Sequence, residues 1–120
     1  LTVAEGMENV FARHRLMRDM VRAGVRALGL ELLVPDECAS PTVTGLRIEN
    51  ADQLRAEIRT KYGVEFAGGQ GPLAGEIMRI GHMGYASPVD MLAALAVLEM
   101  CFGKPGQATA AAERTWSQAR

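Results

Sequence analysis

The sequence contains only two cysteines, Cys38 and Cys101, among its 120 residues. They do not form a CxxC pair, and they do not resemble the disulfide framework of a small secreted protein. We therefore expect a reducing, cytoplasmic location and a fold that needs no disulfide. Apolar runs are also short. None approaches the roughly 18 residues of a membrane-spanning helix, so we expect no membrane partner.

A charge excess of one sign is lacking too, because 13 basic and 14 acidic residues leave a formal charge of -1. Proteins that bind nucleic acid usually carry a strongly basic surface, so nucleic acid is not an expected partner. His14 and His82 are the only histidines, and neither has a Cys or His at the spacing of a metal-ligand set. We expect no metal site. A catalytic role for His82 ranks below a structural one.

The residues that are present suit one globular domain, with 48% hydrophobic and 22% charged residues. The chain begins at Leu1 rather than at a methionine, which suggests a piece of a longer protein. Helical periodicity is strong over residues 5–28, and Gly29 suits the left-handed residue that ends a helix. Arginines form a second stripe on this helix, which we expect to be solvated and partly paired with Asp19: Arg15, Arg18, Arg22 and Arg26.

Two more helices have local start and stop signals. Asn50 is expected to cap one of them together with Gln53, and Gly63 ends it. Ser87 is expected to cap the next, with Asp90 as its reciprocal partner. Residues 104–120 form a tail that is either helical or frayed. Short strands are expected at residues 30–34, 42–48, 64–67 and 77–81.

Helices alternating with short strands predict an α/β fold of the α+β type, in which helices cover a small, mainly antiparallel sheet. A glycine-rich loop precedes the last predicted strand. Residues 69–74 formally fit the dinucleotide-binding pattern GxGxxA, but that pattern needs a following helix, and a strand follows here. We therefore expect no nucleotide site and retain Gly68, Gly69 and Gly71 as candidates for a loop that approaches a small substrate.

Arg79 stands within an apolar strand between glycine-rich segments. A partly buried guanidinium needs an anionic partner, and its planar fork matches a carboxylate through two parallel hydrogen bonds. Alternatively, Arg79 lies on the solvent face of a half-exposed strand, with Met78 and Ile80 pointing the other way. The residues alone leave both possibilities open.

Five segments resemble class V aminotransferases, specifically the alanine–glyoxylate, serine–glyoxylate and serine–pyruvate group. They occur, over about residues 5–102, in the order found in the C-terminal domain of that family. The segments are ENVFARH (Glu8–His14), SPTVT (Ser40–Thr44), GVE (Gly63–Glu65), GGQG (Gly68–Gly71) and RIGHMG (Arg79–Gly84).

This resemblance implies the C-terminal small domain of a fold type I pyridoxal-phosphate enzyme, with residues 1–103 as the domain and residues 104–120 outside it. It implies that Arg79 binds the α-carboxylate of a small amino acid, alanine or serine, whose amino group passes to a 2-oxo acid, glyoxylate or pyruvate. It also implies a large cofactor-binding domain outside this chain and a homodimer of the full-length enzyme.

Lys61 and Lys104 are the only lysines. One ends a helix that we expect at the surface, and the other lies in a Gly-Lys-Pro turn, so neither suits a Schiff base with pyridoxal phosphate. We therefore expect no catalytic residue in this chain, no cofactor bound to it alone and no transamination by it alone. The alternative is a free-standing α/β domain that senses a ligand or binds a protein partner without catalysis.

Overall fold

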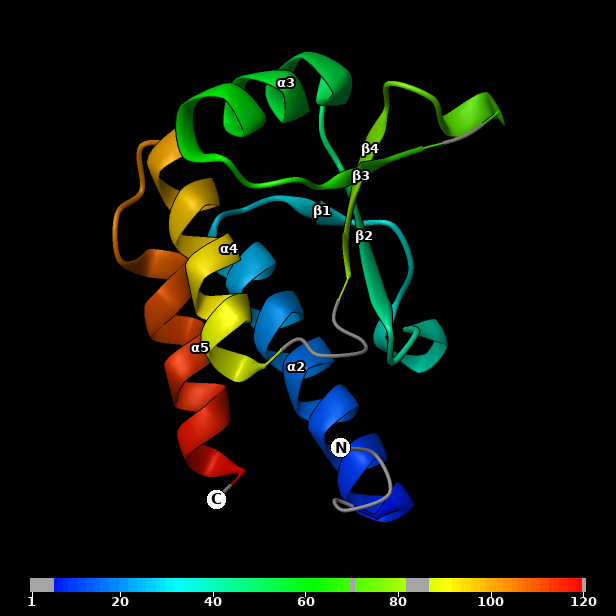
Figure 1. Cartoon of the computed structure of the whole chain (residues 1–120), viewed down its shortest axis with the longest axis vertical. Helices are drawn as coiled ribbons and strands as arrows, with labels where there is room; N and C mark the ends of the chain where they lie inside the picture. Colours follow the sequence, from blue (N-terminus) through cyan, green and yellow to red (C-terminus); the bar gives the residue numbers. More distant parts are fainter. Residues whose placement is uncertain (1–5, 70, 82–86, 120) are drawn as a thin grey trace.

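The computed structural model describes residues 6–69, 71–81 and 87–119. Along the chain α2 is followed by two strands, α3 by two more, and α4 and α5 come last (Figure 1). The helices are α2 (Met7–Ala27), α3 (Ala51–Tyr62), α4 (Pro88–Cys101) and α5 (Gln107–Gln118). The strands are β1 (Glu31–Leu32), β2 (Val43–Arg47), β3 (Ala67–Gly68) and β4 (Ile77–Gly81), and short 3-10 turns cover Asp36–Cys38 and Gly71–Leu73.

The four strands form one sheet in the order β1-β2-β4-β3, and every neighbouring pair is antiparallel. The predicted class, a small antiparallel sheet covered by helices, is confirmed. β2 and β4 pair over their full lengths, from Val43 opposite Gly81 to Arg47 opposite Ile77. β3 lies at the edge and pairs with β4 alone. The strand predicted at residues 64–67 therefore forms later, at Ala67–Gly68, where backbone pairing with β4 is available.

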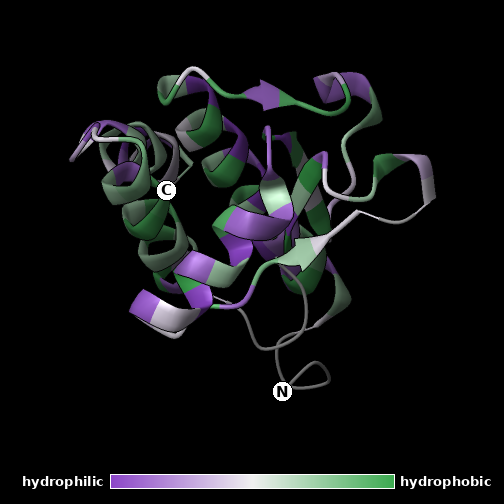
Figure 2. Ribbon diagram, turned by 90° about the horizontal axis from the view of Figure 1, so that it is seen from above, coloured by the Kyte–Doolittle hydropathy of each residue, from purple (hydrophilic) through white to green (hydrophobic). Residues whose placement is uncertain are grey.

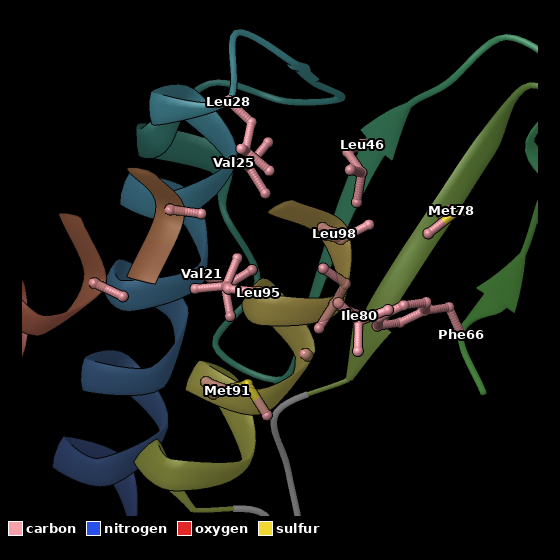
Figure 3. Close-up of a cluster of buried hydrophobic side chains, with 14 of the residues drawn as sticks. Val21, Val25, Leu28, Leu46, Phe66, Met78, Ile80, Met91, Leu95 and Leu98 are labelled. Atoms are coloured by element: carbon pink, nitrogen blue, oxygen red, sulfur yellow. The ribbon is translucent and has the colours of Figure 1, made fainter. Parts of the chain in front are cut away.

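The hydrophobic core lies between one face of the sheet and the helices. α2, α4 and α5 pack against one another beside the sheet, and α3 lies across its end (Figure 1). α2, α3 and α5 each have a hydrophobic and a hydrophilic side, as expected of amphipathic helices, whereas α4 is apolar over most of its length. Figure 2 maps this hydropathy on the ribbon. Side chains from α2 and the residue after it, α4, β2, β4 and the segment before β3 meet in this core (Figure 3): Val21, Val25, Leu28, Leu46, Phe66, Met78, Ile80, Met91, Leu95 and Leu98.

α2 and α4 approach each other closely at Gly24. A Cβ atom at this position would lie 2.7 Å from both δ-carbons of Leu95 and 3.2 Å from the carbonyl oxygen of Ala108. Glycine inside a helix costs about 1 kcal/mol relative to alanine. Here it lets three helices share one tightly packed crossing, and Leu95 and Ala108 are fully buried as a result.

α5 continues the same core. Ala108 and Ala112 belong to the main hydrophobic cluster, and α5 packs on both α2 and α4. A domain boundary at residue 103 stays a prediction. Among the described residues, no helix is both long and apolar enough to cross a membrane.

The helix-start predictions had different outcomes. Ser87 caps α4 as predicted, because its hydroxyl accepts from the Asp90 amide at 3.2 Å and Asp90 accepts from the Ser87 amide at 2.9 Å. The predicted cap by Asn50 with Gln53 is wrong. Asn50 has a left-handed backbone (φ 56°), and its side chain makes no capping hydrogen bond. The Ala51 amide donates instead to the Gly75 carbonyl at 3.1 Å.

Candidate functional site

Arg79 occupies the middle of β4, directly opposite Gly45 of β2 and Ala67 of β3. Its neighbours Met78 and Ile80 are buried in the core, so strand alternation places Arg79 on the other face of the sheet. It is half-buried there. The residues opposite it are small. The Leu33 side chain covers Gly45 on this face, and Ala67 carries only a methyl group.

The Arg79 guanidinium is oriented by a backbone contact. Its Nε donates to the carbonyl oxygen of Gly68 at 2.8 Å. Within the described part of the chain, no Asp or Glu forms an ion pair with Arg79. A guanidinium can bind a carboxylate through Nε and one Nη, or end-on through its two Nη atoms. Because Gly68 occupies Nε, the end-on geometry is the one left for a ligand.

The three candidate loop glycines have different surroundings. Gly68 is the last residue of β3 and contacts Arg79 through its carbonyl oxygen. A Cβ at Gly69 would collide with the Leu73 carbonyl oxygen and lie 2.8 Å from Cγ1 of Ile77, so only glycine fits there. Gly71 has a positive φ of 57° and open space around its Cβ position. The structure therefore brings Gly68 to Arg79, whereas a substrate contact for any of the three stays a prediction.

Arg55 of α3 is a residue that the sequence analysis missed. Its Nη1 donates to the Phe66 carbonyl at 3.3 Å, and its Nη2 lies 3.6 Å from Oδ1 of Asp52. Its guanidinium also lies against Gly68. The one local signal is the Asp52–Arg55 spacing of three residues, which resembles any exposed helical ion pair. Nothing in that spacing indicates contact with β3.

The arginine stripe of α2 is only partly solvated. Arg22 is 3% exposed, which contradicts the predicted solvated face. Its Nε donates to Asp36 at 2.8 Å and its Nη2 to the Val34 carbonyl at 2.6 Å, because the segment after β1 folds back over α2. Arg26 also donates to Asp36, at 2.6 Å. These hydrogen bonds lower the pKa of Asp36 to about 2, with Arg26 contributing most. A cavity of about 300 Å³ beside this cluster is lined by the same charged groups.

The remaining titratable candidates are dispersed. His14 lies on α2, with a buried Nε2 that has no hydrogen-bond partner, while His82 lies outside the described residues. Cys38 is exposed and Cys101 is half-buried, both as free thiols, and burial raises the pKa of Cys101. No group of three or more His, Cys, Asp or Glu side chains that could hold a metal ion occurs within residues 6–69, 71–81 and 87–119.

The two lysines have different surroundings. The Lys104 Nζ donates to the Leu28 carbonyl at 2.8 Å, at the C-terminal end of α2. Lys61 is exposed in the last turn of α3. A Schiff-base lysine instead needs a free amine within a ligand pocket. Neither lysine belongs to β4, the strand that carries Arg79.

No family model matches the chain. It is similar to the small subunit of a soluble hydrogenase from a Synechococcus species, at 38% identity over 97% of this chain and 33% of the relative. It is also similar to the L-aspartate–glyoxylate aminotransferase of Paracoccus denitrificans, at 36% identity over 97% of this chain and 32% of the relative. Among solved structures, the pyridoxamine–pyruvate aminotransferase of Mesorhizobium loti superposes with a TM-score of 0.90 and 37% identity.

That superposition covers 98% of this chain and 33% of the other. It therefore extends beyond residue 103, where we expected the resemblance to end. In each of these comparisons the chain spans about a third of the relative's length.

Proposed function

Because the chain matches the C-terminal part of class V aminotransferases, we propose that it is the substrate-orienting small domain of a pyridoxal-phosphate-dependent aminotransferase. The full-length enzyme would transfer the amino group of a small amino acid, alanine or serine, to glyoxylate or pyruvate. Relatives named for glyoxylate and pyruvate transamination support this acceptor class. We further propose a cytoplasmic homodimer, with residues 1–103 as the small domain and residues 104–120 as its tail.

The observation that carries this proposal is the position of Arg79 and the hydrogen bond of its side chain. Its guanidinium is half-buried, faces away from the core and has one nitrogen already fixed by Gly68. The two Nη atoms form a fork for an α-carboxylate bound end-on. Binding of this kind fixes one end of the amino acid. The bond that reacts is then held in one orientation, an effect that lowers a barrier by about 7–11 kcal/mol in ideal cases.

The glycines at Gly68, Gly69 and Gly71 support the same role. In the proposal these three glycines let a small substrate approach the loop backbone, and the space around Gly71 is open. In our proposal the walls that recognise the substrate side chain lie mostly in the large domain. This chain contributes the carboxylate anchor.

We place the pyridoxal phosphate outside this chain. The hydrogen bond of Lys104 to the Leu28 carbonyl and the exposure of Lys61 at a helix end support this placement. In the proposal, a lysine of the large domain holds it. The residues of this chain bind and orient the substrate and take part in no covalent step, and the chain alone is expected to be inactive.

The experiment that tests the proposal compares Arg79→Ala, Arg79→Lys and Arg47→Ala in the full-length enzyme. Arg47 is the matched control, because strand alternation places it on the same face of the sheet, and its side chain is 43% exposed. Loss of a bidentate charged pair is expected to lower kcat/KM for alanine or serine by about 100-fold or more. Arg79→Lys should restore part of that loss, and Arg47→Ala should cause none.

Cofactor absorbance should be the same in all three variants, since Arg79 is assigned to the substrate and not to the cofactor. If Arg79→Ala keeps the kcat/KM of the parent enzyme, the assignment of Arg79 is wrong. A free-standing sensor domain is not favoured, because the chain matches the C-terminal region of longer transaminases.

A further inference from the structure

Arg55 contacts the same residue that orients Arg79. If Gly68 carried a Cβ atom, that atom would lie 2.9 Å from Cζ, 3.0 Å from Nη1 and 3.1 Å from Nη2 of Arg55. Three nearly equal distances mean that the flat guanidinium lies face-on against Gly68. A side chain at this position would therefore displace the Arg55 guanidinium.

The other contacts of Arg55 hold it in place over β3. Its Nη1 donates to the carbonyl of Phe66, two residues before Gly68. Its Nε is buried without a hydrogen-bond partner. An arginine on a solvated helix surface would turn this group towards water, because burying an unpaired donor is costly. Arg55 instead stays packed on the strand, touching it on both sides of Ala67.

β3 needs such support because it is short and lies at the edge of the sheet. It comprises two residues and pairs only with β4. α3, by contrast, is tied directly to the segment before β4, through the Ala51 amide to the Gly75 carbonyl at 3.1 Å. Arg55 thus connects a helix that is fixed relative to β4 with a strand that has few hydrogen bonds of its own.

We propose that Arg55 is a positioning residue that holds Gly68 in place, so that the Gly68 carbonyl keeps the Arg79 guanidinium oriented for end-on binding of the substrate carboxylate. This inference rests on the proposed function of Arg79. Arg55 does not touch the substrate. It acts through one backbone carbonyl, and its effect therefore requires Arg79 to be present.

The test uses the full-length enzyme with Arg55→Met, Arg79→Met, the double variant and Arg59→Met. Arg59 is the matched control, one turn further along α3 and exposed. Inhibition constants are measured for acetate, which has a carboxylate, and for ethylamine, which lacks one. KM and kcat for alanine are measured alongside.

Arg55→Met is expected to raise the inhibition constant of acetate and the KM of alanine several-fold, up to about tenfold, which corresponds to one hydrogen bond. The kcat and the inhibition constant of ethylamine should change little. In the Arg79→Met background, Arg55→Met should have no further effect on acetate. Arg59→Met should match the parent enzyme.

The possible failures are distinguishable. If Arg79→Met leaves acetate inhibition unchanged, the proposed function of Arg79 itself is wrong. If Arg79→Met weakens acetate binding but Arg55→Met behaves like Arg59→Met, only the role of Arg55 is wrong. An equal Arg55→Met effect with and without Arg79 would mean a merely structural role and would also overturn the inference.

If Arg55→Met does not fold, the variant Gly68→Ala tests whether the contact between Arg55 and Gly68 supports carboxylate binding. This variant keeps Arg55 but places a methyl group under its guanidinium. It should produce the same carboxylate-specific loss, and acetate inhibition like that of the parent enzyme would overturn the proposal.

Discussion

Glu99 of α4 accepts two hydrogen bonds from Thr109 of α5, one from the backbone amide at 2.7 Å and one from the hydroxyl at 2.9 Å. The first turn of a helix has amides without intrahelical partners, and a carboxylate there satisfies them. A side chain of one helix therefore caps the next. Burial alone would raise the pKa of Glu99, but hydrogen bonds from Thr109 and the amides of Gly106 and Ala108 outweigh it and lower the pKa.

Replacing Glu99 should loosen α5. Glu99→Ala leaves the Thr109 amide without its charged acceptor and is expected to lower the free energy of unfolding by about 1.5–3 kcal/mol. Chemical denaturation measures this change. Glu113→Ala, an exposed glutamate on α5 itself, is the control and should change stability little. Equal stabilities of the two variants would show that the cap contributes nothing.

Acid should destabilise the fold through Asp36 and Glu99. The pKa of Asp36 falls from 3.8 to about 2 on folding, and that of Glu99 falls from its ordinary 4.5. Groups with a lowered folded pKa stabilise the fold above their unfolded pKa, and this contribution is lost as pH falls through the folded pKa. Stability should therefore be level above about pH 5 and decline towards pH 2. Thermal melts across this range measure it.

The control for this pH dependence is Asp36→Asn, which removes one of the two carboxylates. Its stability should fall less steeply between pH 4 and pH 2 than that of the parent chain. An identical slope would mean that the contacts of Asp36 with Arg22 and Arg26 do not favour its ionised form.

Gly24→Ala should be destabilising although alanine favours helices. The added methyl group would meet the two δ-carbons of Leu95 at 2.7 Å, and because Leu95 is fully buried its side chain would have to shift within the core. Overpacking of this kind costs about 1–3 kcal/mol. In a Leu95→Ala background the same substitution should be neutral or stabilising. Denaturation of the two single variants and the double variant measures the coupling.

The two lysines provide a further comparison. Lys104→Met removes the hydrogen bond to the Leu28 carbonyl and should lower the free energy of unfolding by about 1 kcal/mol. Lys61→Met, at an exposed position, should not. In the full-length enzyme both variants should keep the cofactor content of the parent, as measured by absorbance. Loss of cofactor in either would contradict its placement outside this chain.

Local signals in the sequence were sufficient for most helix boundaries and for β4. Apolar periodicity over residues 5–28 predicted α2 to within two residues at its start, and the Ser87–Asp90 pair predicted the start of α4. The predicted strand at residues 77–81 has the same bounds as β4. These features depend on residues within one or two turns of each other, which is the range over which a sequence pattern carries information.

Arg79 was singled out from its unusual place in an apolar strand, but its orientation was not predictable. The contact that sets it comes from Gly68 on another strand, 11 residues away, and depends on the strand register.

The sequence by itself determined α2, α3, α4 and β4, because glycine stops, the Ser87 cap and apolar periodicity act between neighbours, whereas α5 and the place of β3 depended on packing and pairing in the fold. The tertiary structure alone decided which charged residues are buried and which residues are their hydrogen-bond partners. Arg22 meets Asp36 across 14 residues, Glu99 meets Thr109 across 10, and Lys104 meets Leu28 across 76. Such partners are brought together only by chain folding, so no local pattern distinguishes a buried arginine such as Arg22 from a solvated one such as Arg15.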